Sequence, residues 1–222
     1  MGQAKRRAGK INVLKAGLSP IDSQKAAAIH EAAHVIAAVH FGVSLGEEGV
    51  SLEELKEYRN GRLRVDYGGY AATQWQGLNA AISDERWSEC AASAMIGPLA
   101  ELRYRLSVSK DVPPEALVNR VLKSGHRDFE SCLSKTTPEE VVEDLARLCL
   151  APLIGQPYKP ITSNPASEYA SAWTALAKSL LDNFYDSAIR RFADYLLSAP
   201  NFRLSSSEAE SFAKQQLKAV TS

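Results

Sequence analysis

His30, Glu31 and His34 are the residues of this sequence best suited to chemistry. Together they form the pattern H-E-x-x-H, in which two histidines can hold zinc and the glutamate can act as a general base. Residues four apart on a helix share one face, so both imidazoles can bind one ion. The carboxylate between them can then take a proton from the attacking water. The pattern therefore predicts zinc-dependent hydrolysis of peptide bonds, provided that a helix carries it.

The flanking residues predict such a helix over about twenty residues. Ser19 fits the N-cap, Pro20 the first helical position and Asp22 the acidic position of a capping box. Residues 26 to 41 are rich in alanine and apolar almost all round, and Gly42 fits a C-terminal cap. Burying the polar side chains of the motif in such a helix costs free energy unless they have partners, and a bound metal would be such a partner. The alternative is a buried helix whose histidines only form hydrogen bonds.

A catalytic zinc site needs a third protein ligand, and His40 is the nearest candidate in sequence. The run H-E-x-x-H-x-x-A-x-x-H is close to the metzincin pattern, which needs glycine where Ala37 stands. On a continuous helix, six residues rotate by about 600° and rise by about 9 Å, so His40 would face away from His34. Met95 falls inside a predicted helix and so does not fit a Met-turn. We therefore expect that His40 is not a ligand.

Glu101 and Asp128 are the two other candidates for the third ligand. Glu101 lies among apolar residues of a predicted helix, so its carboxylate needs a partner, which could be the metal, a ligating histidine or a nearby arginine. Asp128 follows a glycine-containing loop and enters a short helix, from which it could point back at the metal. Composition and spacing alone leave both residues open.

Several segments of this chain resemble the peptidase part of the FtsH-type zinc proteases. AAAIHEAAHVIAAVHFG is similar to the catalytic helix of that family, which typically reads HEAGHAIV. MIGPLAELRY, residues 95–104, looks like the family helix that ends in GGRAAEE. KSGHRDFES, residues 123–131, looks like the family segment TGASNDI, which supplies an aspartate ligand. ALAKSLLDNFYDSAIRRFADYLL is similar to the closing helices of the family, so the resemblance runs over most of the chain.

The resemblance implies a role for each residue that matches a family motif. It makes His30, His34 and Asp128 the zinc ligands and Glu31 the catalytic base. It gives Glu101 a supporting role next to the metal, with direct ligation as the alternative. Two positions depart from the family pattern, since Ala33 stands in place of glycine and Pro98 in place of arginine.

The remaining pattern predicts a mainly α fold with a small β-sheet (α+β), an FtsH-like peptidase domain with a C-terminal helical layer. Residues 62–68 alternate as a half-buried strand after the turn signal Asn60-Gly61, and an exposed edge there could accept an extended substrate. Residues 50–52 are the expected partner strand, although residues 53–58 also fit a helical turn. The expected organisation is a basic flexible tail over 1–18, a zinc-peptidase core over 19–155 and a C-terminal helical part over 156–222, packed on the core.

Helix signals predict six further helices. A helix is expected from residues 83–85, with a kink or interruption at Gly97-Pro98, and another from Pro113-Pro114 to about Gly125. Thr137 is expected as the N-cap of the next helix, with Pro138 in its first position. Three C-terminal helices are then expected, one starting at Asn164-Pro165 and the last starting with the capping box Ser207-x-x-Glu210.

Composition narrows the classes of function. The sequence holds 26 basic and 26 acidic residues, a balance that gives no reason to expect a nucleic-acid partner. The most apolar run, residues 26–43, carries three histidines and a glutamate, so no membrane span is expected. Cys90, Cys132 and Cys149 have no C-x-x-C spacing and are expected as reduced core thiols of a cytoplasmic protein.

These observations together predict a stand-alone zinc metalloendopeptidase, a hydrolase that cleaves flexible or unfolded polypeptides. The chain has no G-x-x-x-x-G-K-[ST] motif, so a separate ATPase or unfoldase, or a regulatory protein, is a possible partner. Two alternatives stay open: a non-proteolytic zinc-containing regulatory or adaptor module that binds a protein partner, and a regulatory peptidase that cleaves one repressor-like protein. The sequence does not indicate an oligomeric state.

Overall fold

The motif lies on α2 (Pro20–His40), a helix at the centre of the protein. A computed structural model describes residues 20–59, 62–75, 84–133, 137–156, 158–159 and 165–221. Every residue from 26 to 38 is buried, because sheet and helices surround α2. Gly42 follows the helix with a φ of 70°, which glycine adopts without strain, as its sequence position predicts. The predicted N-cap Ser19 lies outside the described residues.

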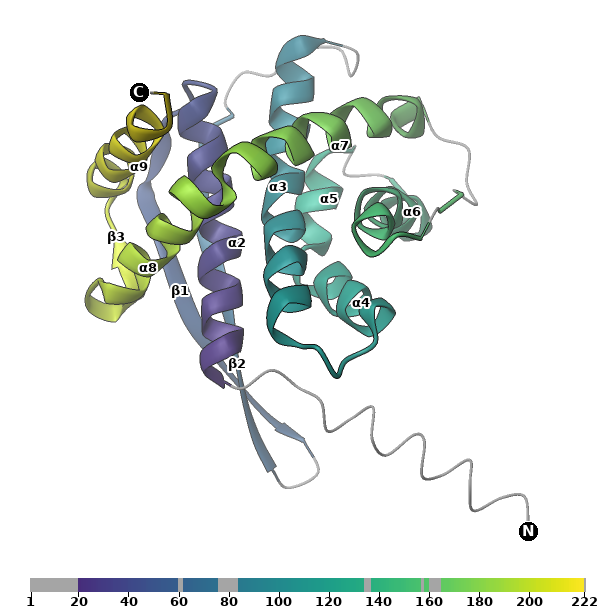
Figure 1. Ribbon diagram of the computed structural model, residues 1–222, viewed down its shortest axis with the longest axis horizontal. Helices are drawn as coiled ribbons and strands as arrows, with labels where there is room; N and C mark the ends of the chain where they lie inside the picture. The colour runs from purple at the N-terminus through teal and green to yellow at the C-terminus, as the bar shows by residue number, and fades with distance from the viewer. Residues whose placement is uncertain are drawn as a thin grey trace.

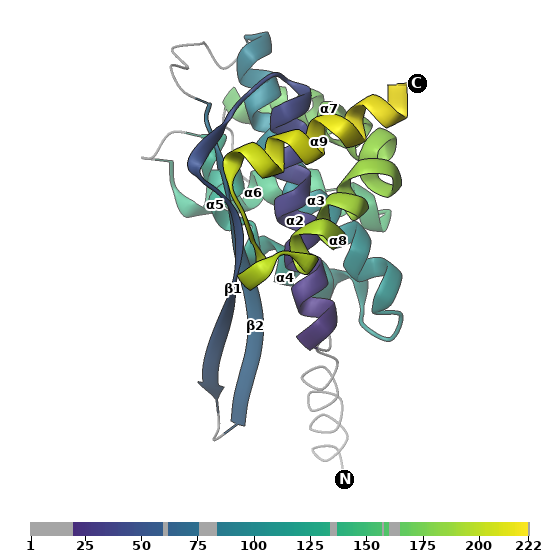
Figure 2. The same cartoon turned by 90° about the vertical axis from the view of Figure 1, so that its left-hand side faces the viewer.

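A three-stranded antiparallel sheet covers one side of α2 (Figures 1 and 2). Its strands are β1 (Leu45–Arg59), β2 (Arg62–Thr73) and β3 (Arg203–Leu204), in the order β2-β1-β3. The predicted strand over 62–68 is confirmed, and residues 53–58 continue β1 rather than forming a helical turn. The predicted turn at Asn60-Gly61 lies outside the described residues. Among the residues that the structure describes, no strand pairs with the second edge of β2, so that edge is free.

Helix α3 (Glu85–Val108) packs along the other side of α2. Its N-cap is Asp84, whose carboxylate accepts a hydrogen bond from the backbone N–H of Arg86 at 2.8 Å. Of the kink or interruption expected at Gly97-Pro98, the interruption is wrong, because α3 runs through both residues. Pro98 is buried there, and the helix approaches Gly125 so closely that a Cβ on Gly125 would lie 2.6 Å from the Pro98 ring. Tertiary packing thus retains a proline that would disfavour an isolated helix.

Three shorter helices lie beside α3: α4 (Pro114–Ser124), α5 (His126–Ser131) and α6 (Glu139–Leu150). The predicted bounds of α4 are confirmed, since Pro113 and Gly125 are its caps. The prediction that Thr137 caps α6 is wrong, because Pro138 holds the N-cap position and Glu139 begins the helix. A 3-10 turn, η1 (Ala151–Ile154), then ends this part of the chain.

The C-terminal part is a layer of helices on the core. It consists of α7 (Pro165–Phe184), a π-helical turn η2 (Tyr185–Ile189), α8 (Arg190–Ser198), a 3-10 turn η3 (Pro200–Phe202) and α9 (Ser206–Thr221). The predicted capping box of α9 is wrong by two residues. The backbone N–H of Ser205 donates to the Glu208 carboxylate at 2.9 Å, whereas Glu210 accepts from the backbone N–H of Leu45.

The hydrophobic core is continuous across these elements, and it joins α2 and α3 to the C-terminal helices. Trp173 on α7 and Phe192 on α8 are fully buried in it. The fold is therefore mainly α with a small antiparallel sheet, as the sequence predicts. In the described part of the chain, no helix combines the length and the apolar character that crossing a membrane requires.

Candidate metal centre

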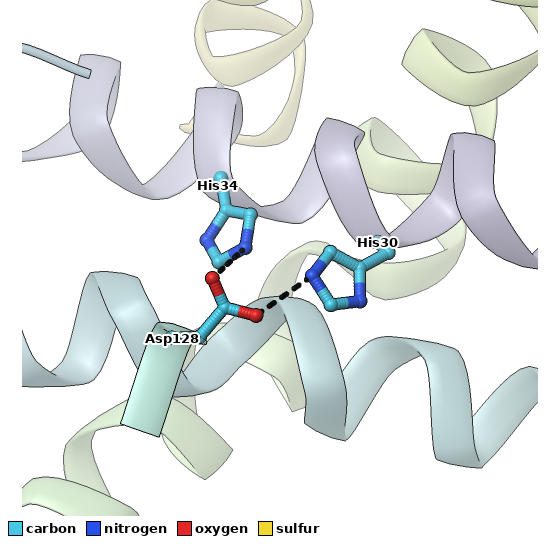
Figure 3. Close-up of side chains that lie close together, drawn as sticks. All are labelled: His30, His34 and Asp128. Atoms are coloured by element: carbon cyan, nitrogen blue, oxygen red, sulfur yellow. Dashed lines mark hydrogen bonds and ion pairs between the residues drawn. The ribbon is translucent and has the colours of Figure 1, made fainter. Parts of the chain in front are cut away.

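His30 and His34 lie one turn apart on α2 and point to the same side, as Figure 3 shows. Their ring centroids are 4.9 Å apart, and both side chains are almost completely buried. His34 Nδ1 lies 2.7 Å from the backbone carbonyl of Ser93 on α3, to which it can donate. That bond directs His34 Nε2 inward, where among the described residues it is buried without a hydrogen-bond partner. An imidazole held this way presents its second nitrogen to a position that a metal can occupy.

Asp128, the third residue of α5, brings its carboxylate between the two imidazoles (Figure 3). Its Oδ2 lies 3.0 Å from His30 Nε2, and its Oδ1 lies 3.4 Å from His34 Nε2. The three potential ligand atoms all lie within 4.8 Å of one another. Two imidazole nitrogens and one carboxylate oxygen are the donors that a catalytic zinc site uses, with a fourth position open for water.

Glu101 lies behind His30, away from Asp128. Its carboxylate accepts from His30 Nδ1 at 2.9 Å, from Arg105 Nε at 2.7 Å and from Ser124 Oγ at 3.0 Å. The contact to Nδ1 leaves Nε2 of the same ring facing Asp128. Glu101 therefore contacts the back of one histidine, whereas Asp128 lies between both.

The electrostatics of the site follow from this packing. Burial alone would lower the pKa of His30, but the Asp128 charge and the hydrogen bonds to Asp128 and Glu101 outweigh it, so the pKa of His30 is raised well above its ordinary value. The pKa of His34 is raised as well, because Asp128 again outweighs burial. Burial would raise the pKa of Asp128, but the two histidines lower it far below its ordinary value. The carboxylate thus stays ionised between two imidazoles.

Glu31 is buried next to the histidines, on the side of α2 that faces β2. A Cβ on Gly69 of β2 would lie 2.4 Å from Glu31 Cγ and 2.6 Å from Glu31 Oε1, so the strand backbone passes directly against this carboxylate. Burial raises the pKa of Glu31, and the nearby histidines offset part of that effect. A buried carboxylate with a raised pKa is suited to proton transfer near neutral pH.

Two glycines bring the surrounding elements close enough to form the site. Gly69 admits β2 to Glu31, and Gly97 admits α3 to the histidines, since a Cβ there would lie 2.3 Å from His34 Nε2 and 2.9 Å from His30 Cδ2. From the sequence, Gly97 is expected only to help break a helix, and Gly69 has no predicted role. A glycine inside a strand can mark a close backbone approach, and that signal was present at Gly69.

His40 is separate from this group. It is the last residue of α2, it is exposed, and its ring packs beside Phe41 and Phe184. A nearby arginine is one of the partners expected for Glu101 from the sequence, and Arg105, four residues further along α3, is that arginine. Ser124 has no role predicted from the sequence, because its proximity to Glu101 depends on how α3 and α4 pack.

Comparison with known proteins gives no relative for this chain: no protein-family model, curated protein or solved structure matches it. The resemblance to FtsH-type proteases therefore stands on the motif residues quoted above.

Proposed function

We propose that this protein is a zinc-dependent endopeptidase that hydrolyses peptide bonds in flexible or unfolded polypeptides. The observation that carries the proposal is the convergence of His30, His34 and Asp128 from two helices that are far apart in sequence. Such an arrangement is costly in a protein interior unless the groups bind something, because two imidazoles and a carboxylate are removed from water.

The residues present fit a zinc ion in their chemistry and in their orientation. His34 Nε2 is buried, lacks a hydrogen bond among the described residues and faces the Asp128 carboxylate. His30 has its second nitrogen held by Glu101, which is the outer contact that orients zinc-ligating histidines. His30, His34 and Asp128 would hold the ion, and Glu101 would position His30.

When bound, zinc would supply a water of lowered pKa and would polarise the scissile carbonyl. Glu31 would take a proton from the attacking water and pass it to the leaving amine. The backbone of β2 at Gly69 lies so close to Glu31 that an added Cβ would clash with this side chain, which limits the movement of the base toward β2. Asp128 and Glu101 would remain ionised and orient the imidazoles.

The free edge of β2 is where we place the polypeptide substrate. An extended chain can add to an unpaired strand edge through main-chain hydrogen bonds, which recognise unfolded polypeptide of almost any sequence. Because β2 contacts Glu31 at Gly69, a strand added there brings its peptide bonds to the base.

The three cysteines are free thiols, which supports a cytoplasmic setting.

Replacing Glu31 by glutamine tests the proposal. The wild type, loaded with zinc, should cleave an unfolded polypeptide, whereas Glu31→Gln should lose about 10²–10⁴-fold in rate, the usual contribution of a general base, and still bind zinc. Glu143→Gln, which alters an exposed glutamate paired with Arg147 on α6, is the matched control. Cleavage by Glu31→Gln at the wild-type rate would refute the mechanism, and zinc binding without any cleavage by the wild type would favour the adaptor alternative.

A further inference from the structure

An ion pair crosses the free edge of β2 near the candidate site. Arg120 of α4 donates from Nη2 to Asp66 Oδ2 of β2 at 2.7 Å, and from the same nitrogen to Ser23 Oγ of α2 at 3.3 Å. β1 occupies the other edge of β2, and β3 lies beyond β1. The Asp66 carboxylate also accepts a hydrogen bond from the backbone N–H of Tyr67 at 3.1 Å, which places it at the edge of β2 away from β1. Arg120, Asp66 and Ser23, here called the edge bridge, thus join three elements across that side.

Two independent estimates, one along β2 and one along α2, place the edge bridge at about the same distance from the candidate site. Along β2, Asp66 precedes Gly69 by three residues, which is about 10 Å of strand. Along α2, Ser23 precedes His30 by seven residues, which is two helical turns and about 10.5 Å on the same face. On α4, Arg120 is one turn before Ser124, which hydrogen-bonds the Glu101 carboxylate behind His30.

We propose that the edge bridge is a stop at one end of the substrate path, so that the enzyme prefers bonds within about three residues of one polypeptide terminus. This inference rests on the proposed function, because it requires a substrate strand along β2 that reaches Glu31 at Gly69. A strand rises about 3.3 Å per residue, so about three substrate residues fit between the scissile bond and the bridge. A longer chain on that side meets the Arg120 side chain.

The bridge can open, which allows internal bonds to be cut more slowly. Its two charged side chains are about one third and one half exposed, and ion pairs of this kind stabilise a structure only weakly. A substrate that is cut at an internal bond must displace the edge bridge. This should slow internal cleavage by up to about fivefold, the factor that corresponds to the largest usual stabilisation by an exposed ion pair. The preference is for one terminus only, because the bridge lies on one side of Gly69.

The test uses the full chain loaded with zinc and a mixture of random-sequence peptides of about twenty residues, with cleavage positions read by mass spectrometry. In the wild type, cuts should concentrate within about three residues of one terminus, by up to about fivefold over internal positions. Asp66→Asn and Arg120→Gln should each spread the cuts evenly, whereas the charge-exchanged double variant Asp66→Arg/Arg120→Asp should restore the preference. Asp182→Asn, which breaks an ion pair with Arg103 at 3.0 Å on another face, is the matched control and should cut like the wild type.

An even distribution of cuts in the wild type would overturn the edge bridge as a stop while leaving the peptidase in place. A terminal preference that persists in both single variants would overturn it as well. If the wild type cuts no peptide, the proposed function fails and this inference fails with it. Thermal melting of each variant, compared with that of the wild type, separates loss of selectivity from loss of folding.

Discussion

The contact between β2 and Glu31 makes Gly69→Ala the most informative substitution near the site. A Cβ at this position would lie 2.4 Å from Glu31 Cγ, whereas ordinary contacts begin at about 3.4 Å, so the glutamate must move by about 1 Å. Displacement of a catalytic group by about 1 Å costs on the order of 10²-fold in rate. We therefore expect Gly69→Ala to lower kcat about 100-fold and to leave zinc binding unchanged, because the three atoms nearest to the added Cβ all belong to Glu31 and none to a histidine.

Gly68→Ala provides the control, since it places the same methyl group on the adjacent residue of the strand. A Cβ on Gly68 meets only the Leu55 side chain at 3.2 Å, and that side chain is half exposed and can move. Cleavage of an unfolded polypeptide by the zinc-loaded proteins gives kcat, and metal analysis gives zinc content. Equal kcat for the two variants would show that the approach of β2 does not position Glu31.

Three further results are expected. Glu101→Gln should weaken zinc binding by about 10- to 100-fold, measured by competition with a chelator, because His30 loses its carboxylate partner. The same variant leaves the buried Arg105 charge uncompensated, so chemical denaturation should show a loss of about 3–5 kcal/mol in unfolding free energy. Zinc binding at pH 6 should release protons, because the pKa values of His30 and His34 are raised and zinc takes only neutral imidazole; calorimetry in buffers of different ionisation enthalpy measures this, and proton uptake would contradict it.

The elements that were predicted correctly are those whose sequence signals lie within the element itself or next to it. The alanine-rich run of α2, the glycine after it and the alternation in β2 depend on neighbouring residues only, so they can be read from the chain. Two of the errors have different causes, tertiary packing at Pro98 and an ambiguous local signal at the start of α9. Pro98 lies inside α3 because the helix is held against α2 and Gly125, and the serine-rich start of α9 offered Ser205 as well as Ser207 to its cap.

The candidate site shows the same division between local and tertiary information. His30, Glu31 and His34 follow from spacing on one helix. Asp128 and Glu101 could not be separated by composition, because the difference between them is which nitrogen of His30 each one faces. That difference depends on how α3 and α5 pack against α2, and only the resemblance to FtsH-type proteases indicated it beforehand.

Zinc content measured on the purified protein and on single-residue variants tests the central claim most directly. The wild type should bind one zinc ion, Asp128→Ala should lose most of it, and His40→Ala should retain it, because His40 lies at the far end of α2 with Phe41 and Phe184. Asp128→Ala with wild-type zinc content, or a wild-type protein that binds no zinc, would contradict the assignment of His30, His34 and Asp128 as a metal centre.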